Sequence, residues 1–117
     1  MAGDYLMRQI EDITRVLATY VLQQKHYRHE EIAQSQQTQT MFLFYRLQRL
    51  ISENMLEEAE QLLLETLAQD ASDENLNVAL DFYEDLQALS EEQLAAGNYS
   101  REKIVKGLQA IQELYHI

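Results

Sequence analysis

The chain contains few of the residues that mark tight turns. It has no proline and only three glycines, Gly3, Gly97 and Gly107, among 117 residues. A β-sandwich or β-barrel needs many turns built on Gly or Pro, so the sequence argues against those architectures. Because 46% of the residues are hydrophobic, the chain has enough apolar side chains to form a core. We expect one all-α domain over residues 1–117.

An amphipathic pattern predicts a first helix over residues 4–24, with Asp4 as its N-cap. Its apolar stripe, which repeats every three or four residues, consists of Leu6, Ile10, Ile13, Leu17 and Tyr20. This stripe either packs within its own domain or docks on a protein partner, for which a homodimer through the N-terminal helix is one form. In the second case we expect Tyr5 and Tyr20 to touch the partner, since tyrosine suits half-buried interface positions.

Residues 25–39 form a polar connection that is rich in glutamine. Such a stretch buries too little apolar surface to order itself, so it is either a solvated helix extension or a mobile connection. We therefore place the one hinge of the chain here. The helical core is predicted over residues 40–117.

Cap residues divide this core into helices. We expect Thr40 to cap a helix whose apolar residues are Phe42, Leu43, Phe44, Leu47, Leu50 and Ile51. We expect Asn54 with Glu57 to form a capping box for the next helix, which ends near Asp70. The remaining predicted start and stop signals are Ser72 or Asp73, a second capping box at Ser90 and Gln93, left-handed Gly97 and Asn98, and Ser100. The predicted architecture is antiparallel helical hairpins behind the N-terminal amphipathic helix.

Gly107 lies within the apolar stripe of the last predicted helix, between Ile104 and Ile111. A glycine inside a helix costs about 1 kcal/mol relative to alanine. We expect a close approach of another backbone at Gly107 to offset this cost.

The charges are distributed unevenly. Residues 53–100 contain thirteen acidic residues and no Lys or Arg, whereas the flanking segments are near neutral. Such a block disfavours binding to nucleic acid or to an anionic membrane, both of which require clustered bases. It is either a solvated surface or a docking face for a basic protein partner. The acidic residues predicted to contact such a partner are Glu57, Glu58, Asp81, Glu84 and Asp85.

The sequence contains few residues that could form a catalytic or metal-binding site. Without cysteine, it has no thiolate ligand or nucleophile, and it carries no glycine-rich phosphate loop. Candidate metal ligands are His26, His29 and Glu30, and a Glu113-x-x-His116 pair that is half of a di-iron pattern. We expect no enzymatic activity, no cofactor and no metal. No secretory signal or membrane span is apparent, so a cytoplasmic location is expected.

Residues 47–67 resemble a tetratricopeptide-type helix pair. The resemblance rests on the tight turn and the Glu57-Glu58-Ala59 sequence, with Asn54 where that repeat usually has glycine. It covers about one repeat, whereas stable arrays need about three.

Several segments are similar to a family of small uncharacterised proteins from Gram-positive bacteria. They are residues 4–12, 54–65, 79–83 and 98–104, together with Gly107-Leu108. The resemblance implies a helical fold and a bacterial cytoplasmic setting, and it implies no activity. Together with the residues above, it favours a non-catalytic protein-interaction module with an acidic surface. A small-ligand or metal-binding helical bundle is the alternative.

Overall fold

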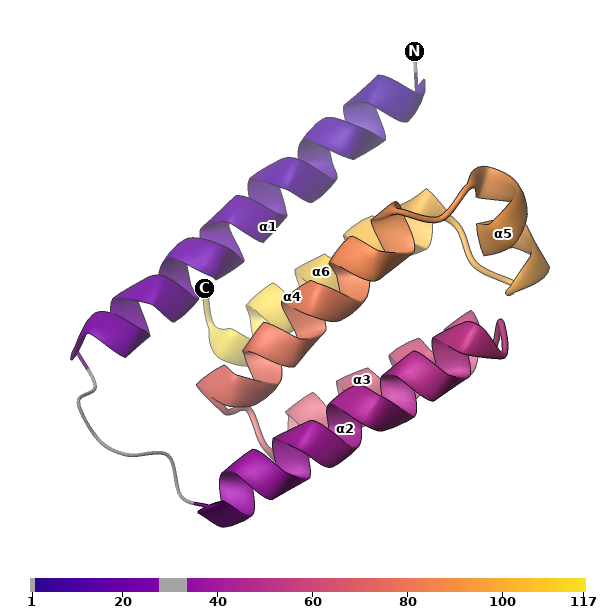
Figure 1. Cartoon of the computed structure of the whole chain (residues 1–117). Coiled ribbons are helices and arrows are strands. Elements are labelled where there is room, and N and C mark those ends of the chain that lie inside the picture. Colours follow the sequence, from indigo (N-terminus) through magenta and orange to yellow (C-terminus); the bar gives the residue numbers. More distant parts are fainter. Residues whose placement is uncertain (1, 28–33) are drawn as a thin grey trace.

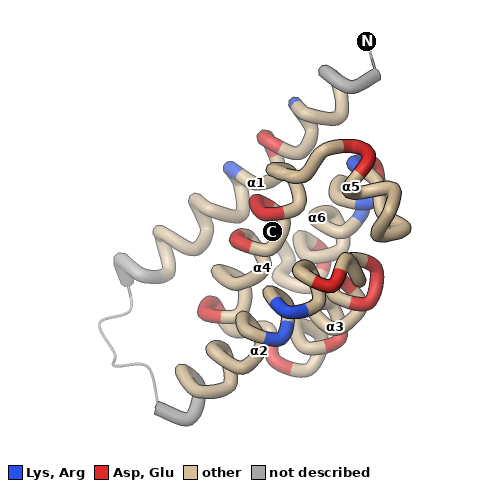
Figure 2. The backbone as a smooth tube through the Cα atoms, turned by 45° about the vertical axis from the view of Figure 1, so that its right-hand side comes forward, with Lys and Arg blue, Asp and Glu red and all other residues tan. Residues whose placement is uncertain are grey.

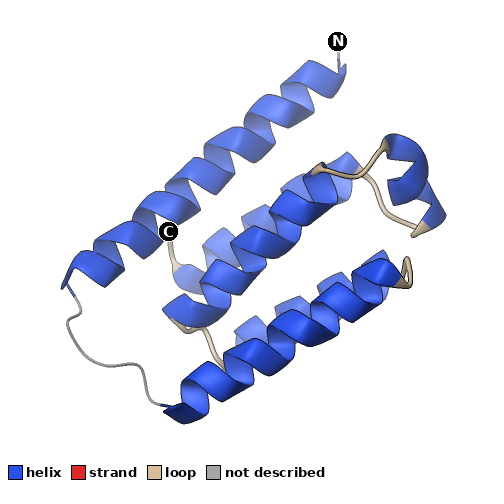
Figure 3. Cartoon of the chain, in the orientation of Figure 1, coloured by secondary structure: helices blue, strands red, loops and turns tan. Residues whose placement is uncertain are grey.

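Helices form nearly all of the backbone in the computed structural model, which describes residues 2–27 and 34–117, and side chains from 5–24 and 37–117. The described part contains no strand, so the all-α prediction is confirmed (Figure 3). Its helices are α1 (Ala2–Tyr27), α2 (Gln34–Ser52), α3 (Leu56–Gln69), α4 (Asp73–Gln87), α5 (Glu91–Ala96) and α6 (Arg101–Tyr115).

Four helices form a bundle that the first helix covers on one side (Figure 1). Helix α2 packs on α3 and α4, and α6 packs on the same two helices from the opposite corner. Helix α1 lies across α4 and α6, on the side away from the α2–α3 pair. Helices α2 and α3 therefore form the corners of the bundle that lie away from α1.

The core runs through all of these layers. Its fully buried members come from every helix, because each long helix turns an apolar stripe inward. Those with the largest side chains are Tyr83, Phe82, Ile10, Leu17, Leu47, Leu56, Leu63, Leu67, Leu76, Leu86, Leu94 and Ile104.

Three of the predicted caps are confirmed. Ser72 Oγ accepts a hydrogen bond from Asn75 N at 3.1 Å and begins α4. Ser90 and Gln93 form the complete capping box of α5. Ser100 Oγ accepts from Lys103 N at 3.3 Å and begins α6. These serines satisfy amides that would otherwise lack partners at the helix N-termini.

Two predicted caps are wrong, because the helices extend beyond them. Helix α1 begins at Ala2, before Asp4, and continues to Tyr27. Helix α2 begins at Gln34, so Thr40 lies inside it, and the polar connection predicted over 25–39 is partly helical at both ends. Glutamine is a good helix former, which explains why a polar stretch without Gly or Pro can extend a helix.

The turn between α2 and α3 also differs from its prediction. Met55 is the N-cap of α3, without a side-chain cap, and Asn54 adopts a left-handed φ of 60°. Glu57 does not reach back to Asn54, because its carboxylate accepts a hydrogen bond from Asn98 Nδ2. Asn54 thus serves as a turn residue, a role for which asparagine is suited by its tolerance of left-handed angles.

A polar junction at the α3–α4 turn ties several helices together. Thr40 Oγ1 donates to Asn75 Oδ1 at 2.9 Å, and Asn75 Nδ2 donates to the carbonyl of Asp70 at 3.1 Å. Tyr115 Oη donates to the carbonyl of Ser72 at 2.6 Å. Because buried Asn75 has partners for both ends of its amide, the junction fixes α2 and α6 on α4 without leaving that amide unsatisfied.

Two glycines provide space rather than unusual backbone angles. Gly97 has a φ of −90°, so the left-handed prediction is wrong for it and confirmed for Asn98, whose φ is 58°. A Cβ at Gly97 would lie 2.6 Å from Leu56 Cγ. At Gly107 a Cβ would overlap the Tyr83 hydroxyl and lie 2.9 Å from Tyr83 Cζ. Side chains, and not the backbone we predicted, therefore make the close approach at Gly107.

We expect Gly107→Ala to lower the free energy of unfolding by about 1–2 kcal/mol. Overpacking costs about 1–3 kcal/mol, while the better helix propensity of alanine returns about 1 kcal/mol at most. Urea denaturation measures the difference, with Gln109→Ala at an exposed position of the same helix as the control. A variant as stable as the wild type would show that the contact at Gly107 is not tight.

Candidate interaction surface

The apolar stripe of α1 lies inside the molecule. Ile10 and Leu17 are completely buried, and the other members, Leu6, Ile13 and Tyr20, are half-buried against the core. The ring of Tyr20 stacks edge-on with that of Tyr115 in α6, with centroids 6.2 Å apart. The stripe is therefore occupied by α4 and α6, and the prediction that it contacts a partner does not agree with this arrangement. Tyr5 alone of the two predicted contact tyrosines is largely exposed.

The predicted acidic contact residues fall on two helices rather than in one patch. Asp81 and Glu84 are exposed on α4. Asp85 is half-buried beside them because its Oδ2 accepts a hydrogen bond from Gln48 Nε2 of α2 at 2.8 Å. Partial burial, with the nearby charges of Glu84 and Asp85, raises the pKa of Asp81. Asp85 thus helps to hold the bundle together.

Glu57 and Glu58 lie at the start of α3, the corner of the bundle diagonal to α4. Glu57 faces Asn98, on the side of α3 that is turned toward α6. Glu58 and Glu65 lie seven residues apart and so share another exposed side of α3. Glu65 Oε1 accepts from Gln61 Nε2 at 3.3 Å. The free surface of α3 is therefore acidic (Figure 2).

Sequence reasoning missed an exposed apolar strip on α2. Met41, Phe42 and Tyr45 are 55%, 65% and 61% exposed. Of the apolar residues predicted for this helix, Phe42 therefore lies at the surface, whereas Leu43 and Leu47 point into the core from the opposite side of α2. The helical spacing of Met41, Phe42 and Tyr45 could have revealed this second stripe.

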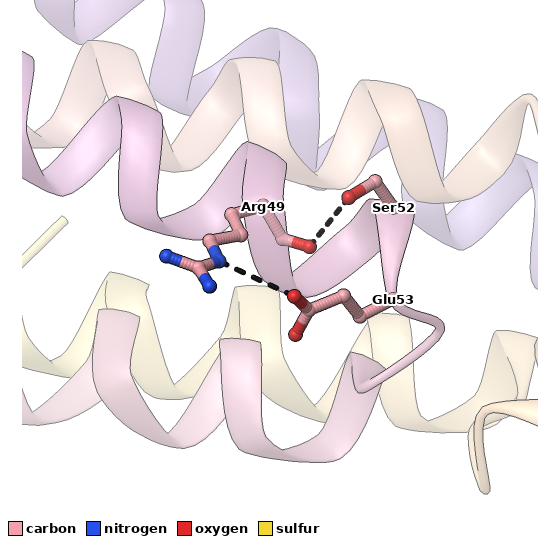
Figure 4. Close-up of polar contacts among 3 residues, drawn as sticks. All are labelled: Arg49, Ser52 and Glu53. Atoms are coloured by element: carbon pink, nitrogen blue, oxygen red, sulfur yellow. Dashed lines mark hydrogen bonds and ion pairs between the residues drawn. The ribbon is translucent and has the colours of Figure 1, made fainter.

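Two arginines extend this strip toward the end of α2. Arg46 and Arg49 are exposed, and each lies four residues after an apolar member of the strip, Arg46 after Phe42 and Arg49 after Tyr45. Figure 4 shows Arg49 at the end of α2, where its Nε donates to Glu53 Oε1 at 3.2 Å and its carbonyl accepts from Ser52 Oγ at 2.7 Å. The Arg49 side chain is 80% exposed despite this ion pair, so it remains accessible. We call Met41, Phe42, Tyr45, Arg46 and Arg49 the α2 strip.

The interior of the bundle holds a carboxylate. Glu60 Oε2 of α3 accepts hydrogen bonds from the hydroxyls of Tyr83, at 2.9 Å, and of Tyr99. Burial raises the pKa of Glu60, although both hydroxyls and the charge of Lys103 oppose the rise. Burial and the Glu60 charge raise the pKa of both tyrosines. The Glu60 carboxylate and the Tyr83 hydroxyl fill the space beside Gly107 of α6. The network therefore joins α3, α4 and α6.

The hollows on the described surface are open depressions. One of about 620 Å³ lies at the end of α6 beside Gln109 and Glu113, and another of about 380 Å³ lies between the α2–α3 turn and α5. Within the described residues, no three His, Cys, Asp or Glu side chains gather as metal ligands. Glu113 and His116 are both exposed, and the other predicted ligands, His26, His29 and Glu30, lie outside the side chains that the structure describes.

Residues 1–116 match a family described as a family of unknown function (DUF6483). No curated protein and no solved structure matches the chain. Among the helices described, none has the length and apolar character needed to cross a membrane. The predicted similarity to an uncharacterised family is confirmed, and it adds no catalytic assignment to any of these residues.

We expect Glu60→Gln to become progressively more stable than the wild type as the pH rises from about 4.5 to 7.5. The pKa of Glu60 is raised on folding, so the native state binds its proton more tightly than the unfolded chain, and the wild type loses stability as the pH rises through this window. Glutamine carries no charge and avoids this loss. Urea denaturation at both ends of the pH range measures the difference, with exposed Glu113→Gln as the control. A difference independent of pH would contradict the raised pKa.

Proposed function

We propose that the chain, which belongs to the DUF6483 family, is a non-catalytic protein-interaction module that docks through the α2 strip. The observation that carries this proposal is the exposure of three large apolar side chains, Met41, Phe42 and Tyr45, on one side of a helix whose other side is anchored in the core. Contiguous exposed apolar patches of this kind mark interaction sites in soluble proteins.

The composition of the strip supports this role. Aromatic residues, methionine and arginine are enriched at protein interfaces, and Tyr and Arg dominate the residues that contribute most to binding. The α2 strip is made of these residue types alone. The fold does not require them at these positions, because Leu43 and Leu47 already supply the core contacts of α2.

The acidic surfaces next to the strip supply selectivity in this proposal. Glu58 and Glu65 lie on α3, on one side of α2, and Asp81 and Glu84 lie on α4, on the other. Apolar burial would provide the affinity, while the carboxylates would favour a partner that carries Lys or Arg and raise its rate of association. The predicted basic partner thus remains part of the proposal.

The α2–α3 hairpin also supports the proposed likeness to a tetratricopeptide-type helix pair. Ala59 is completely buried, as the small residue of that repeat is when two helices approach closely, and Asn54 takes left-handed angles where the repeat has glycine. We expect the module to act in the cytoplasm of a Gram-positive bacterium, on the basis of the sequence similarities and the absence of cysteine.

A photo-crosslinking amino acid at position 42 tests the proposal in cells of the source organism. We expect a covalent protein adduct at position 42, because an exposed docking residue contacts its partner directly. The same amino acid at position 106, which is exposed on α6, serves as the control and should give no adduct of the same mass. Equal adducts at both positions, or none at position 42, would contradict a docking role for the α2 strip.

A further inference from the structure

We infer that the occupant of the α2 strip is a second copy of this chain, paired about a two-fold axis that runs along the α2–α3 hairpin. This inference rests on the proposed function and names its partner. It follows from the charges of two neighbouring helices. The exposed residues of α2 include apolar side chains and two arginines, whereas those of α3 include glutamates. Figure 2 shows the basic residues on α2 and the acidic residues on α3.

The two helices present these surfaces in the same direction. They pack side by side as the outer corners of the bundle, on the side away from α1 (Figure 1). Arg46 lies on the side of α2 that is turned toward α3, since Gln48 marks the side that faces α4. Glu57 contacts Asn98 on the side of α3 that faces α6. Glu58 and Glu65 lie away from that side of α3 and toward α2. The hairpin therefore has one broad surface, with a basic half and an acidic half.

A two-fold axis along this surface places the basic half of one copy against the acidic half of the other. Such an axis keeps the residues of the two copies at the same height along the hairpin. Counted from Asn54 in the turn, Arg49 and Glu58 lie at nearly equal heights, and Arg46 lies between the heights of Glu58 and Glu65. The arginines of one copy then face the glutamates of the other, and the same contacts occur twice, as an isologous interface requires.

The apolar part of the strip is matched as well. By the same count, Phe42 and Tyr45 lie level with the stretch of α3 between Leu62 and Thr66, where Leu62 is half-buried and so still partly exposed to a partner. Aromatic side chains bury the most apolar surface per residue. Two short helices from each copy cover roughly 20 Å by 20 Å, or about 800 Å² over both copies. This area is below that of standard stable interfaces, so we expect a weak dimer whose population depends on concentration.

The pairing also explains why the acidic chain carries arginines on this surface. A chain with a formal net charge of −11 repels its own copies. Arginines opposite glutamates counter that repulsion locally and fix which surfaces meet. The glutamates on α3 of one copy thus find their basic partner in the arginines on α2 of the other copy.

Paired charge reversals test the inference. One variant carries Arg46→Glu and Arg49→Glu, and the other carries Glu58→Arg and Glu65→Arg. Each variant alone places like charges at both symmetric contacts, whereas a mixture of the two places opposite charges at both. By sedimentation velocity of the purified chain, of 13.7 kDa, we expect wild-type dimers, at least about tenfold weaker dimers for each variant alone, and recovery to within about threefold in the mixture.

Controls separate loss of association from loss of folding. Circular dichroism and urea denaturation of each variant establish that the helices remain, which is expected because all four positions are exposed. The matched control reverses Lys106 and Glu113 on α6, which lie outside the hairpin surface, and should leave the dimer unchanged.

A wild-type chain that is monomeric at every concentration would overturn the inference. A dimer that is insensitive to the reversals, or one that the mixture does not restore, would also overturn it. If the purified chain is monomeric while position 42 forms adducts with a different protein in cells, the second-copy inference fails and the proposed function stands. If position 42 forms no adduct either, both fail.

Discussion

Burial of α4 on three sides is the constraint on which the arrangement depends. Helix α4 packs mainly on α1 and α2 and also contacts α3 and α6, and its apolar arc is wide enough to serve these neighbours, with Leu76 and Tyr83 on one side and Phe82 on another. The apolar stripe of α1 was the main candidate for a partner surface in the sequence. It packs instead on α4 and α6 of the same chain. Among the described residues, an exposed apolar strip remains on α2, at a corner whose main contacts are with α3 and α4.

Hydrogen bonds as well as apolar contacts fix how the helices pack against one another. Glu60, Tyr83 and Tyr99 join three parts of the chain through hydrogen bonds, and Gly107 leaves the space that they occupy. Burying a carboxylate even in part is costly without partners, and the two hydroxyls reduce that cost while fixing how α3 meets α4 and the turn before α6. This network occupies the space beside Gly107. The described depressions are instead open and lie at the ends of helices.

An interaction role fits a fold built in this way. The acidic surface that the sequence emphasises is divided between α3 and α4, and Asp85 is partly occupied in binding Gln48. The α2 strip lies between these two acidic regions, so apolar attraction and charge selection are available on one side of the molecule. On the α2–α3 hairpin the two kinds of surface are adjacent, which makes that hairpin complementary to itself.

The sequence by itself determined the helical class, most helix boundaries and three serine caps, because periodicity, absent proline and local capping bonds act over a few residues. It also indicated Gly107 as a position of close packing. It did not determine that side chains make this contact, that Asn54 is a turn residue, or that the stripe of α1 is covered while Phe42 is exposed. Only the tertiary structure decided these points. Two apolar stripes look alike in a sequence, and which of them becomes buried depends on which neighbouring helices remain available to cover it.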